Sequence, residues 1–118
     1  MALNSLLPSK LPPLLVTGRL QRAREIARDS CGVNALVVVS MDNIRWLTGF
    51  TGSTATLVIK DNDSVLIVDG RYTQQGVDQL RLSDASARVV EARTQALQMQ
   101  QLSRELLGIK NCGFDSSE

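Results

Sequence analysis

The stretch that decides the fold is residues 55–72, which reads ATLVIKDNDSVLIVDGRY. It holds two short apolar, β-branched runs, residues 55–59 and residues 64–68, with a polar cluster between them. Runs of this length and composition are typical of buried strands, and a polar loop this short predicts an antiparallel hairpin. The Asp-Gly-Arg-Tyr sequence at residues 69–72 then ends the second strand.

Upstream of the hairpin, the pattern changes to that of a helix followed by a strand. Apolar residues recur every three or four positions from Leu20 to Cys31, with arginines on the other face. This spacing predicts an amphipathic helix, with Thr17 as its N-cap and Gly32 as its stop. Residues 35–40 (ALVVVS) are continuously apolar and predict a strand buried on both faces, as in the centre of an α/β sheet. A short helix or turn is expected at residues 43–47.

Downstream of the hairpin, the same two patterns alternate to the end of the chain. Residues 72–80 predict a helix that begins at Asp69 or Thr73, and residues 87–90 predict a strand. A further helix is expected from Ala96 to Leu106, and a last strand begins at residues 112–114. Strand–helix–strand units favour parallel neighbours joined by right-handed crossovers, so the predicted fold class is α/β with a mixed β-sheet flanked by helices.

The bulk composition indicates a single compact domain. With 118 residues and 43% hydrophobic residues, the chain can bury one core. Residues 1–16 predict an irregular leader because Pro12 and Pro13 cannot continue a helix, and residues 17–118 form the domain. Only four rings are available to a largely aliphatic core, and all four are expected to contribute to it: Trp46, Phe50, Tyr72 and Phe114.

Charge and composition also exclude several classes of function. A net charge of +1 gives no electrostatic attraction for nucleic acid or an anionic membrane, and no apolar run approaches the ~20 residues of a membrane span. Two distant cysteines and the absence of a secretory signal predict a reduced, cytoplasmic domain. The chain has no histidine, which excludes Ser-His-Asp and Cys-His catalysis and histidine-containing metal sites.

Two candidate ligand loops fail on spacing. The glycine-rich segment at residues 49–53 lacks the lysine of a phosphate-binding loop and leads into a strand, so we interpret it as a turn whose glycines permit positive φ. The acidic cluster at residues 61–63 lacks the distal glutamate of a calcium loop and is interpreted as a polar turn.

The Asp69-Gly70-Arg71-Tyr72 corner admits two interpretations. At the end of a buried strand, Arg71 can hold a carboxylate through paired hydrogen bonds, and Tyr72 offers a ring and a hydroxyl group. Alternatively, Asp69 caps the next helix or pairs with Arg71 and only fixes the corner. The residues alone favour the second, structural interpretation.

Three colinear motifs resemble a known family. Residues 43–53 (NIRWLTGFTGS), residues 66–72 with Gln75, and the Gly-Phe-Asp sequence at residues 113–115 are together similar to the N-terminal creatinase-like domain of Xaa-Pro peptidases, the aminopeptidase P and prolidase type. Trp46 stands where a tyrosine is more usual in that family. The resemblance implies the ribonuclease H-like fold of the creatinase N-terminal domain, truncated near its C-terminal end.

The resemblance also implies where the chemistry of such a protein lies. Full-length relatives carry a second, pita-bread domain in which two divalent metals, manganese or cobalt, assist hydrolysis of the bond between an N-terminal residue and proline. That catalytic domain is absent from this chain, so we expect no catalytic residue, metal ligand or cofactor here and no activity from the chain alone. The full-length parent is expected to be an Xaa-Pro metallopeptidase, a hydrolase acting on Xaa-Pro peptides.

For the domain itself, the resemblance implies formation of a homodimer and shaping of the substrate cleft. The matching positions are Phe50, Arg71 and Tyr72, with Asp69 and Gln75 in support. The alternative is a stand-alone protein-interaction module that keeps the creatinase-like fold without peptidase activity. An autonomous enzyme built on Asp69 and Arg71 has no nucleophile or metal constellation to support it.

Overall fold

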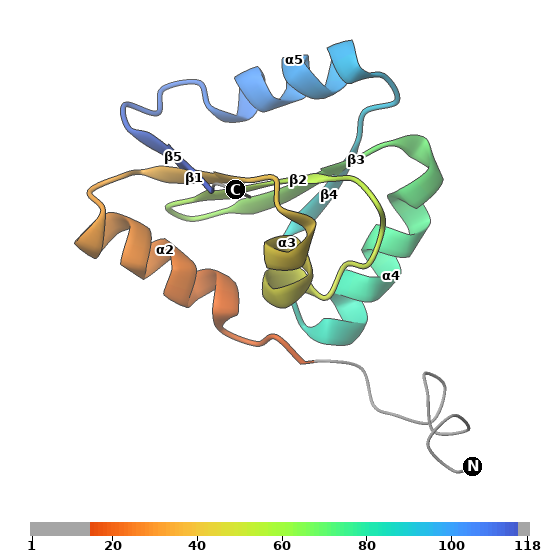
Figure 1. The fold of residues 1–118 in the computed structure, drawn as a ribbon, viewed down its shortest axis with the longest axis horizontal. Helices are drawn as coiled ribbons and strands as arrows, with labels where there is room; N and C mark the ends of the chain where they lie inside the picture. Colours follow the sequence, from red (N-terminus) through yellow and green to blue (C-terminus); the bar gives the residue numbers. More distant parts are fainter. Residues whose placement is uncertain (1–14, 116–118) are drawn as a thin grey trace.

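The computed structural model describes residues 15–115, which form a mixed sheet covered by helices on both faces (Figure 1). In chain order the elements are α2 (Arg19–Ser30), β1 (Ala35–Val38), α3 (Met41–Thr48), β2 (Thr56–Lys60), β3 (Ser64–Val68), the 3₁₀ turn η1 (Gly70–Tyr72), α4 (Thr73–Ser83), β4 (Arg88–Glu91), α5 (Gln95–Glu105) and β5 (Cys112–Phe114). The predicted α/β class with a mixed, helix-flanked sheet is confirmed.

The strands lie in the order β4-β3-β2-β1-β5. The hairpin of β2 and β3 is antiparallel as predicted, and Lys60 closes it by donating its N–H to the carbonyl of Asp63 at 2.7 Å. β3 pairs in parallel with β4 across α4, as predicted for a strand–helix–strand unit, and β1 pairs in parallel with β5. The same prediction is wrong for the other two units, because β1 and β2, which are joined through α3, are antiparallel, and β4 and β5, which are joined through α5, lie at opposite edges of the sheet. The strand predicted at residues 35–40 spans residues 35–38 as β1; it is an interior strand with the expected burial, although β2 and not β1 occupies the middle position of the sheet.

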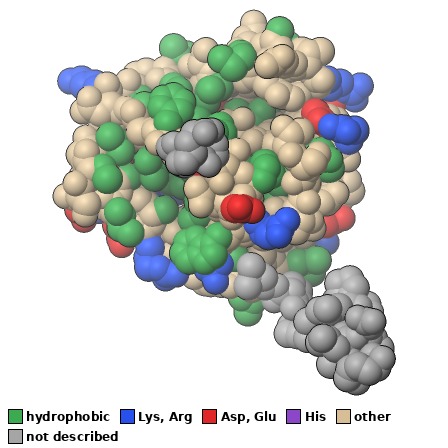
Figure 2. All heavy atoms as spheres, in the orientation of Figure 1, with side chains coloured by type: hydrophobic (Ala, Val, Ile, Leu, Met, Phe, Trp, Pro, Cys, Tyr) green, Lys and Arg blue, Asp and Glu red, His purple; other side chains and the backbone are tan. Residues whose placement is uncertain are grey.

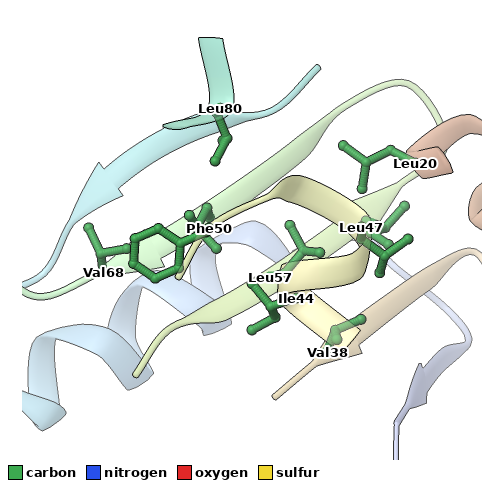
Figure 3. Packing of buried hydrophobic residues seen from close by; sticks show 10 residues of the cluster. Leu20, Val38, Ile44, Leu47, Phe50, Leu57, Val68 and Leu80 are labelled. Carbon is green, nitrogen blue, oxygen red and sulfur yellow. The ribbon is translucent and has the colours of Figure 1, made fainter. Parts of the chain in front are cut away.

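Helices α2, α3 and α4 cover one face of the sheet, and α5 lies over the other (Figure 1). The three-helix face holds the main core, in which Phe50, Val68 and Leu80 lie close together (Figure 3). The opposite face holds a smaller cluster, in which Leu102 of α5 and its C-cap residue Leu106 pack against buried valines and isoleucine of β2 and β3. α5 is therefore the more lightly packed layer.

Two of the four aromatic rings are not in the core, contrary to the prediction. Phe50 is fully buried and Tyr72 packs against the core, but Trp46 is 55% exposed and Phe114 is 65% exposed. Trp46 lies on the outer side of α3, where the Arg19 guanidinium stacks 4.3 Å from the centre of its ring. Phe114 projects from β5, which is an edge strand within the described residues.

The start of the domain also differs from the expectation. The N-cap of α2 is Gly18, in the left-handed conformation, and not Thr17 as predicted. The Thr17 hydroxyl instead donates to the Asp84 carboxylate at 2.7 Å. Val16 is buried, and its N–H donates to the carbonyl of Ser83 at 2.9 Å. The remainder of the predicted leader, residues 1–14, lies outside the described residues. Within the described part, no helix is long and apolar enough to cross a membrane.

Candidate functional site

The turn that leaves α3 places the candidate residues at the end of the three-helix layer. Ser40 caps the start of α3, and Gly49 ends the helix with φ 80°. A Cβ on Gly49 would lie 2.9 Å from Cβ of Ser83, so the chain passes α4 too closely for any side chain. The positive φ expected of the glycine-rich turn is therefore found at Gly49.

Phe50 and Tyr72 meet directly after this turn. Their ring centres are 5.8 Å apart and their planes are at 89°, an edge-to-face contact. Gly52 lies beside them, and a Cβ there would lie 2.4 Å from Cζ of Phe50. Gly52 does not have positive φ, so its role is to leave room for the ring and not to supply an unusual backbone conformation. The turn and the first residues of α4 are thus joined through one buried ring.

Tyr72 presents its hydroxyl group at the surface. The hydroxyl is 2.6 Å from Oγ of Ser53, and this hydrogen bond lowers the pKa of the phenol. The Arg71 guanidinium lies 5.1 Å from the centre of the Tyr72 ring. A ring, a hydroxyl pair and a guanidinium are therefore side by side at this corner.

Asp69 makes both contacts of the structural interpretation. It accepts the N–H of Arg71 at 2.9 Å, and its carboxylate pairs with Nη2 of the Arg71 side chain at 3.0 Å. The hydrogen bond from the Arg71 side chain holds the pKa of the Asp69 carboxyl below its ordinary value. The Arg71 side chain nevertheless stays 71% exposed, so a fixed guanidinium remains open to solvent.

Gln75 connects the helix to the turn. Its amide donates to Thr51 Oγ1 and to Gln79 Oε1, both at 3.3 Å. Gln79 binds the same threonine more tightly, because its amide donates to Thr51 Oγ1 at 2.8 Å and its Oε1 accepts the Thr51 N–H at 2.9 Å. Gln75 and Gln79 thus brace the turn that carries Phe50.

The structure therefore brings the five predicted positions together in two contact groups. Phe50, Tyr72, Arg71 and Asp69 form one chain of contacts, while Gln75 contacts the turn through Thr51. Sequence reasoning missed the polar partners of these residues. The sequence indicates these partners only weakly, through hydroxyl residues within the glycine-rich turn and glutamines four positions apart on one helix. The missed residues are Thr51, Ser53 and Gln79.

The corner also borders a groove of about 460 Å³ lined by Asp69, Gly70, Arg71 and Arg93. Arg93 was not singled out from the sequence, since it lies beyond β4 and far from Arg71 along the chain. It pairs with the Glu91 carboxylate, which also accepts the Thr73 hydroxyl at 2.9 Å. The groove thus joins the end of β4 to the Asp69–Tyr72 corner.

The described residues do not fit a two-metal centre. Within residues 15–115 no three His, Cys, Asp or Glu side chains come together as a metal-binding group, and the whole sequence has no histidine.

Comparison with known proteins identifies the family. The model of the creatinase/prolidase N-terminal domain matches residues 19–118. An uncharacterized peptidase of Bacillus subtilis, YqhT, is 31% identical over 86 residues, which are 73% of this chain and 23% of that protein. The chain thus spans less than a quarter of the length of this curated relative.

Solved structures agree with this result. An Xaa-Pro aminopeptidase from Streptococcus pyogenes is 30% identical, with a TM-score of 0.69 over 88% of this chain and 76% of that one. The N-terminal domain of the cytoplasmic peptidase PepQ from Mycobacterium tuberculosis is 28% identical, with a TM-score of 0.60 over 82% of this chain and 71% of that one. The resemblance seen in the three sequence motifs is confirmed.

Proposed function

This chain belongs to the family of creatinase/prolidase N-terminal domains, and from that membership we propose that it serves as the non-catalytic domain of a proline-specific metallopeptidase. The observation that carries the proposal is the family match over residues 19–118, together with relatives that are peptidases extending well beyond the matched part. The catalytic metals, manganese or cobalt, belong to the second domain of such a protein. The proposed location is the cytoplasm, and it is supported by the description of the relative PepQ from Mycobacterium tuberculosis as a cytoplasmic peptidase.

The proposed task of the domain is to form a homodimer and to shape the cleft in which an Xaa-Pro peptide binds. The corner of Phe50, Tyr72 and Arg71 supports this role, because a rigid ring pair carries an exposed guanidinium and a hydroxyl group. Asp69 fixes the guanidinium, and Gln75 braces the turn from the helix. These groups can contact a substrate without taking part in bond cleavage.

The test compares the chain with the longer protein that carries it. The isolated chain is expected to show no manganese-dependent hydrolysis of Xaa-Pro peptides, because no nucleophile or metal set is gathered within its described residues. The longer protein is expected to hydrolyse them. If the isolated chain is repurified and hydrolysis of Xaa-Pro peptides co-elutes with it, the non-catalytic assignment is contradicted.

A substitution in the longer protein tests the cleft role. Arg71→Ala is expected to lower kcat/KM about tenfold or more with a small loss of stability, because an exposed ion pair contributes only about 0–1 kcal/mol to folding. Arg104→Ala, at an exposed arginine on α5, is the matched control and should leave both quantities unchanged. Equal losses of activity and stability in Arg71→Ala would assign this residue to the structural corner alone.

The size of the protein in its source cells separates the two classes of function. A native protein about three times the size of this chain, on the scale of two to three ordinary domains, supports the peptidase. A native protein of the size of this chain would instead favour a stand-alone interaction module.

A further inference from the structure

The groove bordered by Asp69 and Arg93 lies where two parallel strands end side by side. Val68 of β3 is in register with Glu91 of β4, and the N–H of Ala92 donates to the Val68 carbonyl at 2.8 Å. In α/β folds, ligands bind preferentially beyond the C-terminal ends of parallel strands. The groove of about 460 Å³ occupies this position.

The same two residue types, an acid and an arginine, lie at the C-terminal ends of both β3 and β4. An acid is followed two positions later by an arginine, as Asp69 and Arg71 after β3 and as Glu91 and Arg93 at the end of β4. Each acid is bonded to its arginine, and Glu91 is also held by the Thr73 hydroxyl. The hydrogen bonds from their arginines lower the pKa of both acids, so both are ionised at neutral pH and hold the guanidinium groups in place.

Both guanidinium groups keep donors for a ligand. A guanidinium has five N–H groups. Asp69 accepts from Nε and Nη2 of Arg71, and Glu91 accepts from Nε of Arg93. Among residues 15–115, no other acceptor is hydrogen-bonded to either side chain. The second edge of each guanidinium therefore stays available, and that edge matches a carboxylate in geometry.

Gly70 keeps the floor of the groove open. A Cβ at this position would lie 3.4 Å from Oε2 of Glu91 and 3.8 Å from Cγ of Arg93, inside the space between the two acid–arginine pairs. Gly70 does not have positive φ, so the backbone does not demand a glycine here. What the absent side chain provides is access to the backbone between the two arginines.

We propose that this groove binds the terminal carboxylate of a short peptide, held between Arg71 and Arg93 above Gly70. The proposal rests on the peptidase function proposed above and narrows it to short substrates, whose carboxyl end lies only a few bonds from the Xaa-Pro bond. Arg93 is then a specificity-determining residue. Because Asp69 and Glu91 offset much of the positive charge, we expect a dissociation constant on the order of 1 mM, with selectivity set by geometry.

The experiment is a titration of the ¹⁵N-labelled chain, followed by the NMR shifts of the Gly70 amide and of the Arg71 and Arg93 Nε groups. The probes are glycyl-proline, its C-terminal amide, and the α-amide of glycyl-aspartate, which carries a carboxylate only on its side chain. Saturable shifts are expected with glycyl-proline and not with its amide. Arg93→Gln should weaken binding about three- to fivefold, the range of an exposed charged contact. Gly70→Ala should weaken binding to a similar extent, because its methyl group would take up space beside Glu91 and Arg93.

Arg104→Gln is the matched control, since Arg104 lies near Glu105 at the opposite end of β3 and β4 and should leave binding unchanged. Unchanged circular dichroism spectra show that each variant is folded. Equal binding of glycyl-proline and its amide, or full binding by Arg93→Gln, would overturn the proposal, and so would exclusive binding of the aspartyl probe. This experiment measures binding and not hydrolysis, so its failure would not contradict the proposed peptidase function. The turnover assay of the longer protein tests that function separately.

Discussion

At the scale of single residues, several positions are decided by the space around the backbone. Gly49 and Gly108 have the same φ of 80°, but a Cβ on Gly49 would press on Ser83, whereas nothing lies within 4 Å of a Cβ on Gly108. The pair therefore separates the conformational cost of a side chain from its packing cost.

Gly49→Ala is expected to cost about 2–4 kcal/mol in the free energy of unfolding, from left-handed strain plus overpacking against Ser83. Gly108→Ala is the matched control and should cost only the conformational part, about 1 kcal/mol. Urea unfolding of both variants measures the difference. Equal costs would mean that Ser83 moves aside freely.

Asp115 is a second decisive residue, because it links β5 to the start of α3. Its carboxylate accepts the N–H of Val39 at 2.7 Å, the N–H of Ser40 at 3.0 Å and the side-chain amide of Asn43 at 3.0 Å. Burial raises the pKa of Asp115, but these hydrogen bonds lower it more, so the net pKa lies below the ordinary value.

We expect Asp115→Ala to lower the free energy of unfolding at pH 7 by about 1–3 kcal/mol, because three donors lose their partner. A depressed pKa stabilises the fold above the unfolded pKa of about 3.9, and this contribution disappears as the pH falls through the lower folded value. The gap between wild type and variant should therefore close in acid. Asp61→Ala, in the exposed hairpin loop, is the control and should stay within about 0.5 kcal/mol.

Residue patterns predicted the backbone elements better than they predicted which side chains are buried. The hairpin, the later strands and the helices follow from β-branched runs and three- and four-residue spacing. The small number of aromatic rings predicts that Trp46 is in the core, yet the ring is exposed and the adjacent Arg19 stacks on it at the surface. Ile26 fits the apolar spacing of α2 but is exposed, because only part of that helix face meets the sheet.

The site was predictable only in part, for a related reason. Asp69, Arg71 and Tyr72 are consecutive or nearly so, and a local sequence pattern displays them together. Arg93 reaches the same groove through the pairing of β3 with β4, and a strand register is not visible in one sequence. Contacts of this kind need the fold.

At the scale of elements, α5 is attached to the sheet in an unusual way. Leu102 and the following C-cap residue Leu106 pack against the smaller core cluster, while Glu105, the only acid in the helix, is its one buried residue. Glu105 accepts from Lys60 at 2.7 Å and from Arg88 at 3.1 Å, and its own side chain is only 8% exposed. An ion-pair network thus attaches this helix to the sheet alongside its hydrophobic packing.

Glu105→Gln is expected to lower the free energy of unfolding by about 1–3 kcal/mol and to reduce hydrogen-exchange protection in α5 first. Burial raises the pKa of Glu105, but Lys60, Gln101 and Arg88 lower it further, so the net pKa is depressed. The wild-type contribution is present above the unfolded pKa of about 4.3 and is lost as the pH falls below it.

The variant should therefore lack this acid-dependent loss of α5 protection, which amide exchange at several pH values measures. Glu25→Gln is the control, because Glu25 is exposed on α2. If both variants lose protection equally, the network does not hold α5.

At the scale of the whole molecule, the two edges of the sheet differ in how well they resist pairing with another strand. β4 carries Arg88 and Glu91, and charges on an edge discourage further pairing. β5 reads Cys-Gly-Phe, is uncharged, and exposes the ring of Phe114. Beside it, a largely apolar hollow of about 260 Å³ is lined by Leu36, Val38, Asn43, Trp46, Leu47 and Asp115.

We therefore expect the isolated chain to self-associate through β5 as its concentration rises, with two copies pairing edge to edge. Phe114→Lys should shift sedimentation velocity profiles toward the monomer. Leu82→Lys, at an exposed apolar residue of α4, should leave them unchanged. A monomer at every concentration, or equal effects of the two lysines, would show that β5 is not the contact.

The stacking of Arg19 on Trp46 has a practical consequence for spectroscopy. Trp46 is the only indole in the chain, and it joins α2 to α3 because the Arg19 side chain also donates to the Trp46 carbonyl at 2.6 Å. Its fluorescence therefore reports whether α2 is docked on α3, and the half-exposed ring gives a red-shifted emission maximum even in the native protein. Tryptophan emission would therefore change when α2 is released locally. The aliphatic core contains no tryptophan and contributes no such signal.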